Sequence, residues 1–208
     1  MGSVLSLNLA DVRTIERGGK PVQTGIWKLP APGRVHAGRE GLAGDVQSDR
    51  RVHGGPDQAV YSYAREDIDW WESELGRDLE DGTFGENLTL RGVDVTGARV
   101  GERWRVGDAL LEVSAPRIPC WKLGVRMGDP RFVKRFARAL RPGAYLRVAE
   151  EGAIAAGDRV EVVERPGHGV TVALVAKAYL ADRSLAPRLL EAPALGDGWR
   201  RWAADRAA

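Results

Sequence analysis

Short stretches of alternating apolar and polar residues, separated by glycine or proline, make up most of the chain. Alternation with a period of two is typical of a β-strand with one buried face. The 208 residues include 26 glycines and 11 prolines, so turns are frequent. This pattern favours a mainly β fold over a helical bundle. Strands are expected at 4–9, 23–29, 60–63, 88–90, 103–106, 109–113, 143–148 and 159–163.

Helical periodicity occurs at two places within this β-rich part. Residues 65–75 have apolar side chains at helical spacing, and Gly76 is a natural end for a helix. Asp129 and Pro130 are the residue types that cap a helix and occupy its first position. We therefore predict a second helix that opens there.

The composition changes after residues 166–169. Three short helical patterns follow, at 172–180, 184–190 and 197–206. Each is too short to be stable alone, so they are expected to fold together or against the β-rich part. The sequence therefore predicts an α+β, mainly β chain with a barrel-like domain at 1–166 and a small three-helix domain at 170–208.

Charge and cysteine content exclude several classes of protein. The 31 basic and 29 acidic residues give a net charge of +2, which leaves no broad nucleic-acid footprint. A single cysteine excludes an intramolecular disulfide framework, a cysteine-rich zinc site and an iron–sulfur cluster. No apolar run approaches the roughly 20 residues that cross a bilayer, and no signal peptide is evident. We expect a cytoplasmic protein with no membrane partner.

The single cysteine, Cys120, stands in an unusual local sequence. Pro116 and Pro119 precede it, and the cationic residues Arg117 and Lys122 flank it. Prolines end a strand and stiffen a turn, and nearby positive charge lowers the pKa of a thiol. The sequence therefore predicts a strand that ends in a rigid turn presenting a reactive thiolate. The alternative is a small buried side chain.

A glycine-rich loop at 41–60 contains acids, arginines and His53. Glycines let backbone amides approach an anion closely, and arginine binds phosphate through two parallel hydrogen bonds. A solvated loop is the alternative reading, and His53 is as easily a structural histidine as a ligand.

The pair Glu86–Asn87 stands at the entrance of an expected strand, between Phe84 and Leu88. Buried polar groups require hydrogen-bond partners. The pair therefore either braces the loop or meets a ligand.

Five motifs in one order together resemble the MOSC domain, the module at the C-terminus of molybdenum-cofactor sulfurases. They are Gly44-Asp45 with His53-Gly54-Gly55, Phe84-Gly85-Glu86-Asn87-Leu88, Gly107-Asp108, Pro116-Arg117-Ile118-Pro119-Cys120 and the run 143–148. The helical tail is similar to the three-helix domain that follows MOSC in many bacterial members. The resemblance covers nearly the whole chain.

This resemblance implies a barrel-like fold that binds a pterin-based molybdenum cofactor. Cys120 matches the cysteine that ligates molybdenum in the amidoxime-reducing members, and a soft thiolate suits that metal. The other implied site residues are Arg50, Arg51, Gly54, Gly55 and Glu86 for holding the cofactor, Asn87 and Arg117 at its metal end, and His53 as a catalytic candidate.

The function expected on this basis is reduction of small N-hydroxylated compounds, such as hydroxylated purines, amidoximes or hydroxylamines. The chain has no dinucleotide-binding glycine motif and no haem or iron–sulfur ligand set, so an external electron-donor protein is expected. Two alternatives stay open. One is sulfur transfer or carbon–sulfur cleavage by Cys120, with a base among His36, His53 and His168. The other is a non-catalytic module that carries the cofactor to another enzyme.

Overall fold

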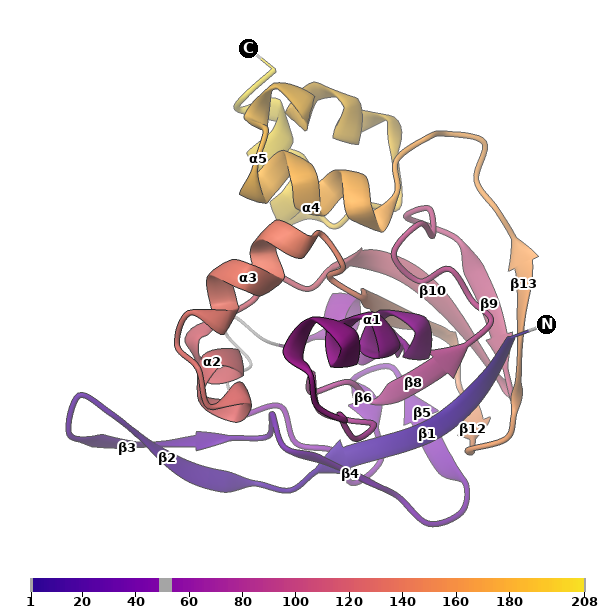
Figure 1. Cartoon of the computed structure of the whole chain (residues 1–208). Helices are drawn as coiled ribbons and strands as arrows, with labels where there is room; N and C mark the ends of the chain where they lie inside the picture. The colour runs from indigo at the N-terminus through magenta and orange to yellow at the C-terminus, as the bar shows by residue number, and fades with distance from the viewer. Residues whose placement is uncertain (1, 49–53, 208) are drawn as a thin grey trace.

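The computed structural model describes residues 2–48 and 54–207, and within them seven strands close into a barrel (Figure 1). The closed order follows from the pairing of the last strand with the first, in addition to the pairing along the sheet. Around the barrel the strands are β1 (Gly2–Ala10), β13 (Arg159–Glu164), β9 (Arg103–Val106), β10 (Ala109–Pro116), β11 (Ala144–Glu150), β7 (Val60–Ala64) and β8 (Leu88–Arg91). The predicted mainly β, barrel-like fold is therefore confirmed.

The barrel interior is apolar because inward-facing residues alternate with polar ones along the strands. In β9, Trp104 and Val106 are fully buried, whereas Arg103 and Arg105, which alternate with them, are partly exposed. Leu88, Leu111 and Leu146 from three other strands join the same core cluster. Among the described strand pairs of the barrel, β7 with β8 is the parallel one, and the others are antiparallel.

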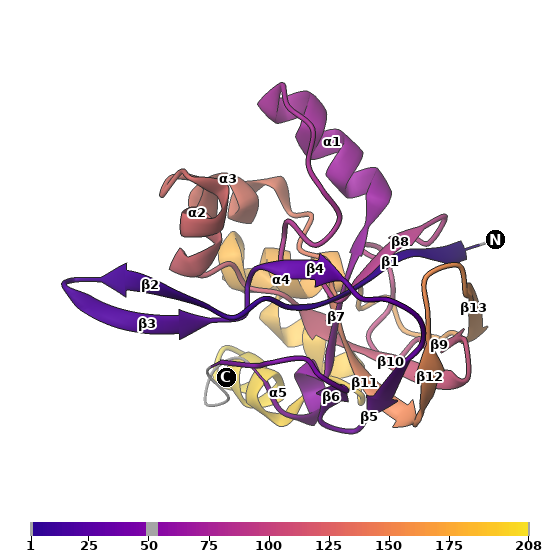
Figure 2. The same cartoon turned by 90° about the horizontal axis from the view of Figure 1, so that it is seen from below.

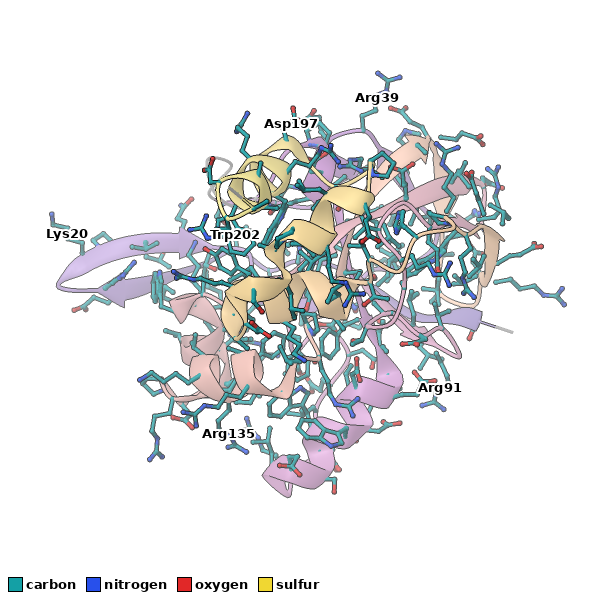
Figure 3. The ribbon with its side chains drawn as sticks, turned by 90° about the horizontal axis from the view of Figure 1, so that it is seen from above. Lys20, Arg39, Arg91, Arg135, Asp197 and Trp202 are labelled. Atoms are coloured by element: carbon teal, nitrogen blue, oxygen red, sulfur yellow. The ribbon has the colours of Figure 1, made fainter. Side chains whose placement is uncertain are left out.

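Shorter strands lie outside the closed barrel. β2 (Arg13–Arg17) and β3 (Lys20–Thr24) form a hairpin that projects away from the body, with Lys20 near its far end (Figures 2 and 3). The remaining short strands are β4 (Lys28–Pro30), which pairs with β1, and β5 (Val35–Gly38), β6 (Gly41–Leu42) and β12 (Gly152–Ile154), which pair with one another.

The hairpin corrects the sequence-based prediction of one strand at 23–29. The chain leaves the strand conformation at 25–27, between β3 and β4. Gly25 lies so close to Val46 that a Cβ at this position would come within 2.4 Å of the Val46 carbonyl oxygen. This close approach requires glycine at position 25. It places the interruption between β3 and β4 next to the segment that contains Val46.

Three helices cover one side of the barrel (Figure 1). They are α1 (Arg65–Leu75), α2 (Trp121–Met127) and α3 (Phe132–Ala139). Between them and the barrel lies a second core, in which the rings of Trp71 and Phe136 stack with centroids 6.1 Å apart. The helix predicted to open at Asp129 begins at Phe132 instead, because the Asp129 side chain accepts from the Arg131 amide in a preceding turn.

The C-terminal segment forms α4 (Val172–Leu180), η2 (Arg183–Glu191) and α5 (Asp197–Ala204) above the barrel (Figure 1). The middle element is a 3-10 helix with Pro187 inside it, and proline leaves one backbone donor out of its hydrogen-bond pattern. A third apolar core holds these elements together and includes Val100 from the β-rich part. The domain boundary between 166 and 170 stays a prediction.

In the described part of the chain, no helix has both the length and the apolar character needed to cross a membrane.

Candidate functional site

Cys120 lies at the junction between β10 and α2. Pro116 is the last residue of β10 and pairs with Ala144, so the strand runs three residues further than the predicted 109–113. Cys120 has an extended backbone and is the residue that caps α2, whose first turn is closed by the bond from the Leu123 amide to the Cys120 carbonyl. Cys120 as a residue is partly exposed, which differs from the fully buried side chain considered as the alternative.

A pocket opens beside Cys120 at one end of the barrel. Its described wall also contains Asn87, Arg117 and Gly54, which the sequence had singled out. Its cavity volume is about 110 Å³. The structure therefore brings four of the predicted site residues to one pocket.

Arg117 is a buried cation in this wall, with 6% of its surface exposed. Its guanidinium donates to the Phe84 carbonyl and lies 5.2 Å from the centroid of the Tyr61 ring. Burial works against its charge, but Tyr61, Tyr145 and Cys120 raise the pKa of Arg117 above its ordinary value. The side chain therefore stays protonated, and among the described residues it has no carboxylate in an ion pair.

A buried network of Lys28, Asp45 and Asn87 forms another part of the wall. Lys28 Nζ donates to both Asp45 oxygens at 2.5 and 2.6 Å, and Asn87 Nδ2 donates to Asp45 Oδ2 at 2.8 Å. Asn87 also accepts from the Tyr61 amide through Oδ1 at 3.0 Å. Burial lowers the pKa of Lys28, and the neighbouring Asp45 opposes that shift. Asn87 thus both braces β7 and fixes the charged pair at the pocket.

The sequence reasoning missed Lys28 and Asp45, although a signal for each was present. Asp45 follows Gly44 in one of the quoted motifs, and Lys28 is a charged residue between Trp27 and Leu29 in an apolar stretch. Charged residues on the described wall are Lys28, Arg117 and Lys122 against Asp45. The pocket is therefore electropositive.

Glu86 is placed behind the pocket and is not among its lining residues. It is fully buried, where Oε1 accepts from the Gly82 amide at 2.6 Å and from Thr89 Oγ1 at 3.1 Å, and Oε2 accepts from the Phe84 amide at 2.9 Å. Burial raises the pKa of Glu86 to about 7, although these hydrogen bonds favour the charged form. Of the two roles considered for this residue, the described contacts are those of a loop brace.

The glycine-rich loop is only partly described. Arg50, Arg51 and His53 lie outside the described residues. Gly54 lines the pocket and donates its amide to Gln58 Oε1 at 3.2 Å, whereas Gly55 precedes the short helix η1 (Pro56–Gln58) and is not in the described wall.

Gln47 supplies an unusual feature of the pocket wall. Its Nε2 donates to the carbonyls of Glu40 and Gln58, each at 3.3 Å. Its Oε1 is buried, and no hydrogen-bond donor of the described residues reaches it. A buried acceptor without a partner is costly, which makes this oxygen a candidate to receive a hydrogen bond from a ligand.

Comparisons with known proteins agree on one family. The MOSC domain profile matches residues 49–161. The chain is 38% identical to YflK of Bacillus subtilis over 95% of the chain and 91% of YflK, and 33% identical to YiiM of Escherichia coli over 88% of the chain and 83% of YiiM. It is also 34% identical to a Gibberella moniliformis protein named "Reductase", and the match covers 79% of the chain but only 30% of that longer protein.

Solved structures give the same answer. YiiM from Geobacillus stearothermophilus superimposes with a TM-score of 0.83 at 31% identity, covering all of both chains. YiiM from Escherichia coli gives a TM-score of 0.73 at 26% identity, with 99% of this chain and 92% of that chain covered. The motifs, the barrel and these matches lead to one conclusion: the chain belongs to the MOSC domain family.

Proposed function

We propose that this protein binds a pterin-based molybdenum cofactor with Cys120 as a metal ligand and reduces N-hydroxylated compounds. The overall reaction is R–NH–OH + 2 H⁺ + 2 e⁻ → R–NH₂ + H₂O, so the N–O bond breaks and the oxygen leaves as water. The electrons come from a separate electron-donor protein. When bound, the cofactor supplies the two-electron chemistry, and the protein supplies position and charge.

The observation that carries the proposal is that one pocket combines the Cys120 thiol with buried Arg117. A thiolate is a soft ligand suited to a metal already held by sulfur. Among the described residues no group of three or more His, Cys, Asp or Glu side chains is placed to hold a metal ion. A cofactor with its own sulfur donors would supply a metal at Cys120 with ligands that these described residues do not. The reductase name of one relative agrees with the direction of the reaction.

The other wall residues suit the rest of such a cofactor. Arg117 and Lys122 provide positive charge for a phosphate, and Arg117 has no described carboxylate that competes for it. The unpartnered Gln47 Oε1 is an acceptor for a ring N–H of a pterin. Because the cavity volume is about 110 Å³, a cofactor of this size would extend beyond the cavity toward the surface.

Proton supply is the second role of the pocket. The reaction consumes two protons, and Lys28 Nζ is a buried donor on the wall. Burial lowers the pKa of Lys28, which makes its ammonium a better acid, and Asp45 holds the ammonium in place. We assign Lys28 as the residue that gives a proton to the departing oxygen.

The test replaces Cys120 by serine in protein produced by a host that makes the cofactor. We expect molybdenum per chain to fall at least tenfold, and N-reduction of benzamidoxime with an artificial electron donor to be lost. Val125→Ala is the matched control, because Val125 lies on the same helix, α2, with 43% of its surface exposed. Parent-level reduction by Cys120→Ser at equal cofactor loading would overturn the proposal.

The sulfur-transfer alternative needs a base near Cys120. Of the histidines considered for that role, His36 and His168 do not line the described wall of the pocket, and His53 lies outside the described residues. Mass spectrometry after exposure to a sulfur donor separates the two functions. A stable persulfide on Cys120 in protein without molybdenum would replace the reductase proposal with sulfur transfer.

A further inference from the structure

A second cleft lies between the C-terminal helices and the barrel, next to the thiol pocket. Its volume is about 470 Å³, within the range of about 300–1,000 Å³ usual for small-molecule sites. Tyr179 of α4 and Trp199 and Trp202 of α5 form one wall, and Trp202 is labelled on α5 in Figure 3. The opposite wall includes residues of η1 and of the end of β10. We call this space the aromatic cleft.

The three aromatic rings form a cluster that stays accessible. Tyr179 lies 5.2 Å from both tryptophan rings, and the two tryptophan rings are 6.3 Å apart, measured between centroids. Tyr179 is 41% exposed, and both tryptophans are only partly buried. The Arg206 guanidinium lies over the Trp202 ring, with its central carbon 4.6 Å from the ring centroid, so Tyr179 is the most exposed ring of the three. An exposed aromatic ring in a cleft offers a surface on which a flat ring can stack.

The aromatic cleft and the thiol pocket share part of their walls. Gln58 lines both spaces. Ile118, also in the wall of the cleft, stands two residues before Cys120 on the same turn. The aromatic cleft and the thiol pocket are therefore adjacent, at Gln58 and at the turn that leads to Cys120.

Asp57 places a negative charge at the edge of this cleft. Arg147 Nε donates to Asp57 Oδ1 at 2.6 Å, and among the described residues no donor reaches Oδ2. A carboxylate accepts hydrogen bonds from N–H groups and favours a positively charged ligand. The wall thus combines an aromatic stacking surface with one acceptor for N–H.

We infer that the aromatic cleft binds the flat aromatic ring of a nitrogen-rich substrate, by stacking on Tyr179 at the exposed side of the aromatic cluster and by hydrogen bonding to Asp57. As a statement about substrate, this inference rests on the proposed reductase function. Binding of the ring in the aromatic cleft involves only residues of the chain, so it is expected in protein without cofactor as well. The cleft then determines which N-hydroxylated compounds are good substrates, while the thiol pocket performs the reaction.

The binding experiment uses the full-length protein without cofactor and two amidines of equal charge. Benzamidine has a flat aromatic ring, and cyclohexanecarboxamidine has a puckered saturated ring. Ligand-detected NMR should show saturable binding of benzamidine, with at least tenfold weaker binding of the saturated analogue. Equal binding of the two ligands, or no binding of benzamidine, would overturn the inference.

Variants of the cleft locate the binding. Trp202→Leu and Tyr179→Ser should each weaken benzamidine binding about tenfold or more, and Asp57→Asn should weaken it several-fold. Tyr179 is exposed, so its variant keeps the test valid if Trp202→Leu does not fold. Val163→Ser is the matched control, since Val163 is an apolar residue 50% exposed on β13 and lies outside the cleft. Unchanged binding by the folded cleft variants would refute the assignment.

Kinetics of the cofactor-loaded protein separate this inference from the reductase proposal. For benzamidoxime, Tyr179→Ser should raise KM several-fold and leave kcat near the parent value. For hydroxylamine, which has no ring, both constants should be unchanged. If benzamidine binds the cleft but no N-hydroxylated compound is reduced, only the reductase proposal fails. If reduction occurs and the variant has the parent KM for benzamidoxime, only the aromatic cleft is wrong.

Discussion

The barrel interior and the thiol pocket lie next to each other but are built on opposite physical rules. The interior is filled with apolar side chains such as Leu88 and Leu111, which are stabilised by leaving water. The pocket buries Lys28, Asp45 and Arg117, whose charges are costly to remove from water. The apolar composition of the barrel interior is explained by its contribution to stability alone. The buried charges of the thiol pocket lower the stability of the fold. Their presence despite this cost is an argument for a function.

The largest effect on stability is expected where one member of a buried charged pair is removed. Asp45→Ala leaves Lys28 without its counter-charge, leaves the Ala10 amide without its acceptor and leaves Asn87 Nδ2 with the Asn8 carbonyl alone. Breaking a buried pair costs about 3–5 kcal/mol. We expect a loss of that size in the free energy of unfolding, measured by urea denaturation.

A double variant makes the comparison sharper. Lys28→Met with Asp45→Asn removes both charges and keeps an acceptor for the Ala10 amide. It should recover at least half of the lost stability, yet still impair reduction of N-hydroxylated compounds. If the double variant is as active as the parent, the buried pair has no functional role.

The next largest loss of stability is expected from creating a cavity in the barrel interior. Leu111→Ala removes a fully buried side chain from the centre of the core, a change that costs about 2–5 kcal/mol. Under conditions where the variant stays folded, molybdenum loading and KM should equal the parent values. A change in loading without loss of fold would show that the two regions are coupled.

A smaller and pH-dependent effect is expected at Glu86. Its pKa is raised to about 7 in the folded chain, whereas an unfolded glutamate titrates near 4.3. The folded state therefore holds a proton that the unfolded state has lost between these values. Stability from this group is fully present below about pH 4 and decreases by up to about 1.4 kcal/mol per pH unit as the pH rises toward 7.

The Glu86→Gln variant isolates this contribution because glutamine does not titrate. The difference in unfolding free energy, parent minus variant, should decrease as the pH rises from 5 to 7. Denaturation curves of both proteins at several pH values provide the measurement. A difference that stays constant or increases would contradict the raised pKa.

Local sequence patterns were sufficient for some elements and not for others. The helix at 65–75 was predicted with its full length because its apolar spacing is regular and Gly76 ends it in a left-handed conformation. The hairpin of β2 and β3 was missed because its side chains are mostly exposed on both faces, so no alternation marks it. Helix α2 was missed because its seven residues follow directly on a proline-rich turn.

The residues of the candidate site also divide into those that local sequence motifs identified and those that they did not. Cys120, Arg117 and Asn87 stand in recognisable motifs and were found in the pocket. Lys28 was missed because its role depends on Asp45, 17 residues away along the chain, and on contacts that exist only once the barrel has closed. The aromatic cleft was missed for a similar reason, since Tyr179 and Trp202 read as apolar positions of separate short helices.

The parallel pairing of β7 with β8 has a consequence for how such a protein can diversify. Parallel neighbours need a long crossover, and here residues 65–87 with α1 provide it. Both strands therefore begin at the same rim of the barrel, where the Tyr61 amide meets Asn87. The helical part of the crossover can be lengthened, shortened or given a new outer surface while that rim is kept. Strand direction thus separates the crossover, whose outer surface faces away from the pocket, from the rim that carries the pocket residues Tyr61 and Asn87.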